Sequence, residues 1–430
     1  MTLIKNQNKT LLYFLLIFSL LAFLSPLSSA IFVLLSLMVV ASPLLLKDHK
    51  MLCFWIFSAC FMSCFRYQTV FLAMLDVAMA IFIIKTLITK PRDYKKLKFI
   101  LIALSFFLIC FVYSCVVNGN AYKISQSIGI VLAICTLYLL KKDINIKDII
   151  IYLSIGLFVS SMLSLISYAS GLITLKSLGE KEGHFFRFGG YFCNVNSLAL
   201  YCSLCQACLL YLFAINHLDI KKWLWLLIAI TLLGFSSFSK TFILITVLTY
   251  GLAIIISFIS SKNKKTYIKY SLILLAIGIL LSPIIIKYIK IIFERFYITS
   301  NETQILNAAT TGRMDIWKSY LSKWVSSPLY ILFGCGITAP NINNKTPHNF
   351  LISLLYKFGI IGILILLVLL LYVLKQLKVS KNPMGYLPLV AIILNGLTED
   401  LSCSLYTCLP IMIALIFILK NNSTIISKEN

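Results

Sequence analysis

The stretch "LISLLYKFGIIGILILLVLLLYVL", residues 351–374, decides the fold class of this chain. Its only charged side chain is Lys357, and the run is longer than the roughly 20 apolar residues that an α-helix needs to cross a bilayer. Similar runs recur along all 430 residues, which are 60% apolar and only 12% charged, about half the charged share of an ordinary soluble domain. We therefore predict an all-α, polytopic integral membrane protein.

The apolar runs predict fourteen transmembrane helices within a single membrane domain, residues 1–430. The first and second runs form one tight hairpin, and the ninth and tenth runs form another. If each hairpin counts as one span, the number of spans falls to twelve. The first run follows Lys5 and Lys9 like a signal peptide, but further runs follow at once, so we expect an uncleaved helix. The predicted spans are residues 10–25, 29–46, 51–65, 69–85, 99–117, 126–140, 148–169, 190–214, 222–238, 241–260, 269–288, 347–374, 384–397 and 402–419.

The net charge of +24 follows from the loops between these spans. Most of the 38 Lys and Arg residues fall in alternate loops, such as "KTLITKPRDYKKLK" at 85–98 and "SKNKKTYIK" at 261–269. Loops that stay on the cytoplasmic side of a membrane collect basic residues. We therefore expect both termini in the cytoplasm of a bacterial inner membrane, with membrane lipids and not nucleic acid as the reason for the charge.

Two longer segments then fall on the extracytoplasmic, periplasmic side, a loop at 170–189 and a large loop at 289–346. The large loop contains "TTGRMDIWKSYLSKWVSSP", which predicts an amphipathic helix that Thr311 could cap and that ends before Pro328. The pair of tryptophans on its apolar face suggests a helix lying on the outer leaflet. The predicted apolar stripe consists of Ile316, Trp317, Tyr320, Leu321 and Trp324.

Four side chains on that same side could carry chemistry: Arg187, Lys240, Arg313 and His348. Each has an ordinary explanation by itself, such as a cation that reaches lipid headgroups, a solvated loop charge or a helix-capping histidine. Taken together, three cations suit a diphosphate, and a histidine can accept a proton near neutral pH. The chain has no Asp-x-Asp motif, and we predict neither a metal nor another cofactor.

Other polar groups inside or near the predicted spans are open to more than one interpretation. Asp76 lies in the middle of a span, where a charge is costly, so it either pairs with a partner or stays protonated. Glu399 and Asp400 flank a short outer turn that water can reach. The run Cys202, Cys205 and Cys208 lies in a helix without a nearby histidine, and it predicts small-residue packing and not a metal site.

Five motifs in chain order resemble the O-antigen ligase and O-antigen or capsular polysaccharide polymerase superfamily over residues 185–420. They are "RFGGYFCNVNSLALY", "FSKTF", "GRMDIW", "SSPLYILFGCGI" and "PHNFLISLLYKFGIIGILILL". The chain departs from the family at Asn194-Val195-Asn196, where Asn-Pro-Asn is common, and at Ser239-Lys240-Thr241, where Ser-Arg-Thr is common. Lysine keeps the charge of arginine but loses its planar fork.

The resemblance implies a metal-independent glycosyltransferase that uses an undecaprenyl-diphosphate-linked glycan as donor. His348 would be the general base for the acceptor hydroxyl, Arg313 would act beside it in the reaction, and Arg187, Lys240 and Arg313 would bind the diphosphate. The acceptor would be a second lipid-linked glycan for a polymerase, which we favour, or lipid A–core for a ligase. A chain-length regulator protein would be a further partner.

A lipid-linked sugar flippase is the main alternative from another class, because many spans and Asp76 would suit a transporter. A transporter predicts short loops on both sides, which the large 289–346 loop does not match. A non-enzymatic membrane scaffold is a further alternative.

Overall fold

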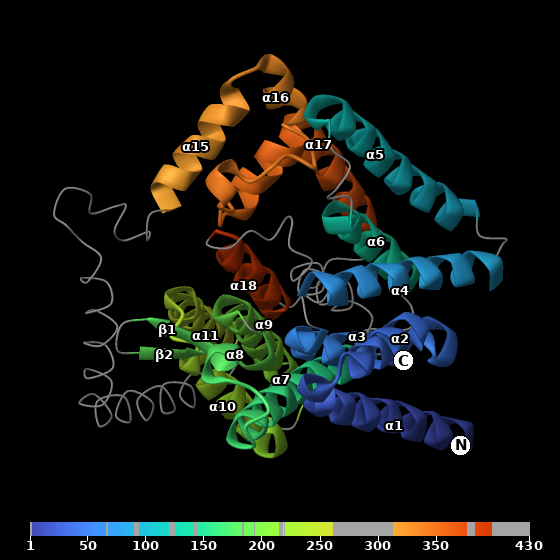
Figure 1. Cartoon of the computed structure of the whole chain (residues 1–430), viewed down its shortest axis with the longest axis vertical. Helices are drawn as coiled ribbons and strands as arrows, with labels where there is room; N and C mark the ends of the chain where they lie inside the picture. The colour runs from blue at the N-terminus through green and yellow to red at the C-terminus, as the bar shows by residue number, and fades with distance from the viewer. Residues whose placement is uncertain are drawn as a thin grey trace.

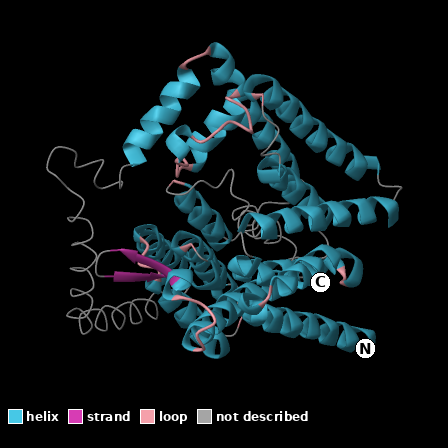
Figure 2. Ribbon diagram, in the orientation of Figure 1, coloured by secondary structure: helices cyan, strands magenta, loops and turns pink. Residues whose placement is uncertain are grey.

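The structure is a computed structural model that describes residues 2–65, 68–89, 94–119, 125–140, 144–182, 185–192, 194–214, 218, 220–260, 313–375 and 383–397. It is mostly helical, with one small β-hairpin (Figures 1 and 2). The longer helices are α1 (Thr2–Leu24), α2 (Ser29–Leu45), α3 (Asp48–Ser58), α4 (Gln68–Thr89), α5 (Tyr94–Asn118), α6 (Ser125–Leu140), α7 (Ile146–Ala169), α9 (Val195–Ala214), α10 (Ile220–Ser236), α11 (Lys240–Ser260), α15 (Arg313–Val325), α17 (Phe350–Lys375) and α18 (Leu387–Gly396). The short elements are α8 (Leu175–Leu178), α16 (Pro328–Phe333), β1 (Gly179–Glu182), β2 (Phe185–Phe188) and the 3₁₀ turns Ser25–Leu27, Ala59–Phe65, Gly190–Phe192, Ile342–Asn344 and Pro383–Tyr386.

Most of the predicted spans coincide with α-helices in the described residues. The 51–65 span is α-helical only to Ser58 and continues as a 3₁₀ turn, and the 384–397 span becomes α-helical at Leu387. The spans at 269–288 and 402–419 lie outside the described residues, as do Glu399, Asp400 and the 289–312 part of the large loop. Within the described ranges, five helices are long and apolar enough to cross a membrane: Lys9–Leu27, Leu97–Asn118, Ile146–Ala169, Val195–Ala214 and Phe350–Val368. Several shorter apolar helices accompany them, including Ser29–Leu45 and Lys240–Ile256.

The first four helices pack around aromatic side chains. Phe18 of α1 meets the edges of Phe54 and Phe61 at centroid distances of 5.3 and 5.6 Å. Trp55 of α3 donates its indole N–H to Ser42 Oγ of α2 at 2.7 Å. This buried indole N–H is thus bonded internally, as a lipid environment requires of buried polar groups.

Asp76 on α4 is an exception to that rule. Its side chain is 6% exposed, and neither carboxylate oxygen has a hydrogen-bond partner in the described part of the chain. Of the two interpretations from sequence, a protonated carboxyl agrees with these surroundings.

Helix α9 lies at the centre of the second group of helices, between α7, α10, α11 and α18 (Figure 1). Cys202, Cys205 and Cys208 are each fully buried in it, and Cys205 Sγ lies 2.9 Å from Ser154 Oγ of α7. The predicted packing role of this cysteine run is therefore confirmed. Asn395 of α18 donates to Ser203 Oγ of α9 at 2.9 Å, so α18 is tied to the same helix.

The third group contains α15, α16 and α17, which lie beside the end of α5 at the top of Figure 1. The loop 334–338, from the motif "FGCGIT", joins them: Tyr113 donates to Gly334 O at 2.9 Å and Asn118 donates to Cys335 O at 2.8 Å. Gly334 and Gly359 have positive φ angles of 78° and 62°, and their backbones touch. Gly359 therefore bends α17 where the loop packs against it.

Two local features differ from the sequence-based expectation. The 170–189 loop contains the antiparallel β1–β2 hairpin, in which Glu180 faces Arg187. The amphipathic helix forms as predicted, α15, and Pro328 begins the next helix, but Tyr320 is 1% exposed and packs on α17. Part of the apolar stripe thus binds the protein itself and not a membrane surface; the proposed cap, Thr311, lies outside the described residues.

Candidate functional site

Arg187 ties three elements together. It lies on β2, is 8% exposed, and donates from Nε to Ser237 O at 3.1 Å. One terminal nitrogen donates to Asn196 Oδ1 at 3.0 Å, and the other lies 3.5 Å from Glu180 Oε2. The guanidinium is thus fixed between the hairpin, the beginning of α9 and the turn that joins α10 to α11, and only a planar fork with several donors can do this.

The beginnings of α9 and α11 both lie beside Arg187. Asn194 caps α9, because its Oδ1 accepts from the backbone N–H groups of Asn196 and Ser197 at 2.8 and 3.2 Å. Ser239 caps α11 by accepting from Phe242 N at 3.3 Å. The positive ends of two helix dipoles therefore accompany the guanidinium, an arrangement that favours anions.

Lys240 is the first residue of α11, three residues after the carbonyl that Arg187 binds. Its side chain is half-buried, and its Nζ is buried from solvent. The structure therefore brings Arg187 and Lys240 into one neighbourhood, as the sequence motifs predict. The spacing between the two motifs in the sequence could not show that Arg187 binds the turn before Lys240.

His348 occupies an unusual backbone conformation. Its φ angle is +46°, in the left-handed region that few residues other than glycine adopt. Nε2 of the half-buried imidazole lies 3.1 Å from Thr346 Oγ1. The next residue, Asn349, caps α17 by accepting from Ile352 N at 3.1 Å, so the histidine lies in a bend just before the helix.

Arg313 is the first residue of α15 and is half-buried. Residues 313, 317 and 320 lie on one face of an α-helix, because they are spaced by four and three residues. Trp317 on that face donates its indole N–H to Pro347 O at 2.7 Å, directly before His348. Arg313 and His348 therefore belong to the same unit of the structure.

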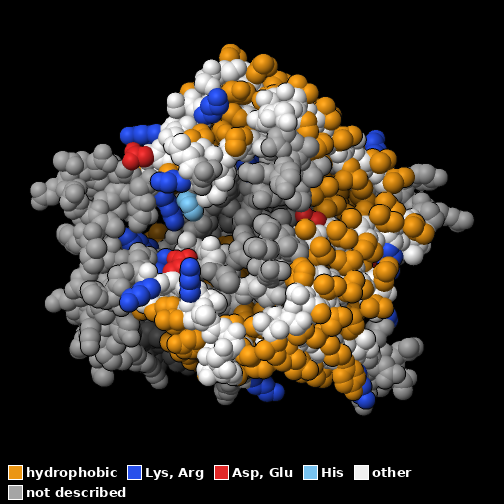
Figure 3. Space-filling model, viewed as in Figure 1, with side chains coloured by type: hydrophobic (Ala, Val, Ile, Leu, Met, Phe, Trp, Pro, Cys, Tyr) orange, Lys and Arg blue, Asp and Glu red, His pale blue; other side chains and the backbone are white. Residues whose placement is uncertain are grey.

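A short series of hydrogen bonds relates the two pairs of residues. Asn349, next to His348, donates to Leu397 O at the end of α18 at 3.2 Å. Asn395 of α18 donates to Ser203 of α9. Asn196, which accepts from Arg187, lies about 10 Å along the helix axis from Ser203, toward the beginning of α9. Figure 3 shows Lys and Arg side chains around a histidine on the hollowed face between α15 and the hairpin. The structure thus places Arg187 with Lys240 at the beginnings of α9 and α11, and Arg313 with His348 at the beginnings of α15 and α17.

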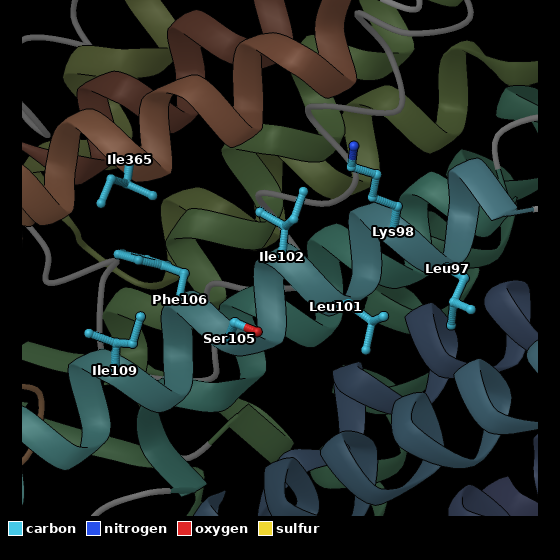
Figure 4. A pocket seen from close by; sticks show the side chains of 8 residues that line it. All are labelled: Leu97, Lys98, Leu101, Ile102, Ser105, Phe106, Ile109 and Ile365. Carbon is cyan, nitrogen blue, oxygen red and sulfur yellow. The ribbon is translucent and has the colours of Figure 1, made fainter.

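A second feature is an apolar groove of about 680 Å³ between α5 and α17 (Figure 4). Its lining consists of Leu97, Lys98, Leu101, Ile102, Ser105, Phe106, Ile109 and Ile365. Lys98 supplies the only charge in that lining. Such a surface can take a hydrocarbon chain but offers little polar recognition.

Sequence reasoning did not identify several residues that build this region. Asn196, Glu180, Trp317 and Asn349 all hold a predicted site residue or its neighbour. Asn196 and Asn349 do lie inside the quoted motifs, so their type and position carried a signal. Trp317 was assigned to a membrane-facing stripe, because tryptophan on an amphipathic helix is common at a bilayer surface.

In comparisons with known proteins, no protein-family model and no curated protein matches the chain. Its function must therefore be argued from the residues and their geometry.

Proposed function

We propose that the chain is a membrane glycosyltransferase that polymerises undecaprenyl-diphosphate-linked oligosaccharide repeat units on the outer face of the bacterial inner membrane. The observation that carries this proposal is the buried Arg187 guanidinium, which is held beside Lys240 at two capped helix beginnings, an arrangement that favours an anion. Support for a nearby base comes from His348, whose preceding residue is bound by the helix that begins with Arg313. The motif resemblance named above points to the same four residues.

The proposed reaction uses each group once. The acceptor hydroxyl oxygen bonds to the anomeric carbon of the donor sugar while the bond from that carbon to the diphosphate oxygen breaks. His348 accepts the proton of the hydroxyl. The electron pair of the broken bond leaves with the diphosphate, whose added negative charge Arg187, Lys240, Arg313 and the helix dipoles stabilise.

The lipid part of such a donor needs an apolar surface that can contact a long hydrocarbon chain. The groove between α5 and α17 supports the proposal in this respect, because its lining is almost wholly apolar (Figure 4). The exposed faces of α1, α5 and α10 carry many further large hydrophobic side chains that suit contact with lipid tails.

The test is transfer by the full chain in membranes supplied with a lipid-linked oligosaccharide, followed by a gel of the products. His348→Ala should lower the rate by about 10²–10⁴-fold, the usual contribution of a general base. His49→Ala is the matched control, because His49 pairs with Asp148 between α3 and α7. A normal ladder of products from His348→Ala would sink the proposal.

The same assay separates the two acceptors. Longer glycans that remain on the prenyl lipid indicate a polymerase, whereas transfer only to added lipid A–core indicates a ligase. If the lipid-linked donor crosses the bilayer without any new glycosidic bond, the chain is a flippase and the proposal is wrong.

A further inference from the structure

We propose that α15 is a positioning helix, in which the Trp317 indole and the Tyr320 hydroxyl hold the 341–347 loop so that His348 faces the substrate beside Arg313. This inference rests on the proposed function for the role of His348. The sequence pattern alone predicts that this helix lies on a membrane surface, and the inference gives the helix a different role.

Two side chains of α15 hold the loop at separate points. The Trp317 indole N–H donates to Pro347 O at 2.7 Å. The Tyr320 hydroxyl donates to Lys345 O at 2.7 Å and accepts from Ile342 N at 3.1 Å. The Tyr320 ring also meets Tyr356 of α17 edge to face, with 4.7 Å between centroids. The loop is therefore tied to α15 along its length, up to the residue before His348.

The backbone of His348 needs such restraint. With φ at +46° the residue is in a conformation that a β-carbon disfavours, so it persists only where both neighbours are held. Pro347 is held by Trp317 on one side. Asn349 is held on the other side by its cap on α17 and by its bond to Leu397 O.

Arg313 lies on the same face of α15 as the two anchoring side chains. The spacing from 313 to 317 is one turn of helix, a rise of about 6 Å. The helix that carries the cation therefore also carries the bonds that fix the histidine, and the distance between these two groups depends on a single rigid element. An error of about 1 Å in such a distance can cost a factor of about 100 in rate.

Trp317→Phe tests this role because it removes the N–H donor and keeps an aromatic ring. Trp324→Phe is the matched control: Trp324 is on the same helix, and its indole N–H has no hydrogen-bond partner in the described part of the structure. Tyr320→Phe is a second test variant, since it removes only a hydroxyl group.

The first measurement is steady-state transfer by the purified full chain in nanodiscs. We expect Trp317→Phe to lower kcat by about 10- to 100-fold, with the KM for the donor within about twofold of wild type. Tyr320→Phe should lower kcat in the same direction, and Trp324→Phe should behave like wild type. An unchanged kcat in Trp317→Phe, or an equal loss in Trp324→Phe, overturns the inference.

The second measurement does not depend on activity. Diethyl pyrocarbonate modifies accessible imidazoles, and mass spectrometry reports the rate at His348 with His49 as internal reference. We expect Trp317→Phe to change the rate at His348 and leave that at His49 unaltered. If this change occurs while wild-type protein transfers no sugar, the positioning role stands and the proposed function fails. If His348→Ala is inactive but neither measurement responds to Trp317→Phe, the function stands and the positioning role fails.

Discussion

Arg187 makes three contacts that a lysine at the same position could not reproduce. Its nitrogens contact Ser237 O, Asn196 Oδ1 and Glu180 Oε2 from one planar group. A hydrogen bond to a charged group contributes about 1.5–3 kcal/mol. We expect Arg187→Lys to lower transfer by about 10- to 100-fold and to lower the thermal unfolding midpoint as well.

Lys181→Arg, on the neighbouring strand and exposed, is the control for that substitution. Transfer assays at matched membrane levels decide the outcome. If Arg187→Lys transfers sugar at the wild-type rate, the guanidinium group of Arg187 has no role in the proposed site.

Replacing Asp76 should stabilise the protein, whereas replacing Arg187 should destabilise it. A buried polar group without a hydrogen bond costs about 1–3 kcal/mol, and both oxygens of Asp76 are in this state within the described residues. Asp76→Leu should therefore raise the thermal unfolding midpoint in detergent and leave transfer unchanged. A lower midpoint, or lost transfer with normal folding, would show that the carboxyl has a partner or a function.

Cys335 predicts a pH dependence. Burial raises the pKa of this thiol from its ordinary value of 9.0 to about 11. Between these two values the unfolded chain gives up the proton that the folded chain keeps, so the Cys335 contribution to stability falls as pH rises. Because alkylation needs the thiolate, a single-cysteine variant with only Cys335 should react slowly with iodoacetamide at pH 8 and rapidly after unfolding. Rapid reaction of the folded protein would contradict the burial.

At the scale of elements, the bend in α17 depends on glycine. A β-carbon on Gly359 would clash with the backbone N of Gly334, and the φ angle of 62° adds backbone strain. Gly171 has a similar φ of 73° but nothing within 4 Å of an added β-carbon. Gly171→Ala should therefore cost about 1 kcal/mol from strain alone, and Gly359→Ala should cost clearly more.

Thermal unfolding of the two variants separates strain from contact. Gly359→Ala should also reduce transfer. His348 lies just before α17, so a shift of α17 against loop 334–338 would move the histidine. Equal midpoints for Gly171→Ala and Gly359→Ala would mean that the backbones of Gly334 and Gly359 do not need to touch.

For the whole molecule, the distribution of lysine and arginine predicts the orientation in the membrane. In a cysteine-free background, single cysteines at the exposed positions 321–323, 325 and 326 should react with an impermeant maleimide in intact spheroplasts. Single cysteines at positions 90–96 should react only after the membrane is opened. The reverse pattern would invert the topology and place the proposed site on the cytoplasmic side.

Much of the fold could be predicted from sequence because each helix depends on its own composition. Most predicted spans that the structure describes are largely helical, and the amphipathic helix begins at Arg313 and ends before Pro328. The four candidate residues could also be named from sequence, because they lie in the quoted motifs on the predicted outer side of the membrane. The contacts of Trp317 were not predicted, because an amphipathic stripe does not show whether lipid or protein covers it.

The amino-acid sequence was enough to show where most of the chain is helical and which side chains could bind an anion or accept a proton. Apolar runs must close their own backbone hydrogen bonds in a lipid environment, and this is a local requirement. Only the tertiary structure decided that Arg187 meets the turn before Lys240, that Trp317 holds the residue before His348, and that Cys335 is bound by Asn118. These bonds join residues distant in sequence, and they form only when packed helices bring the partners together.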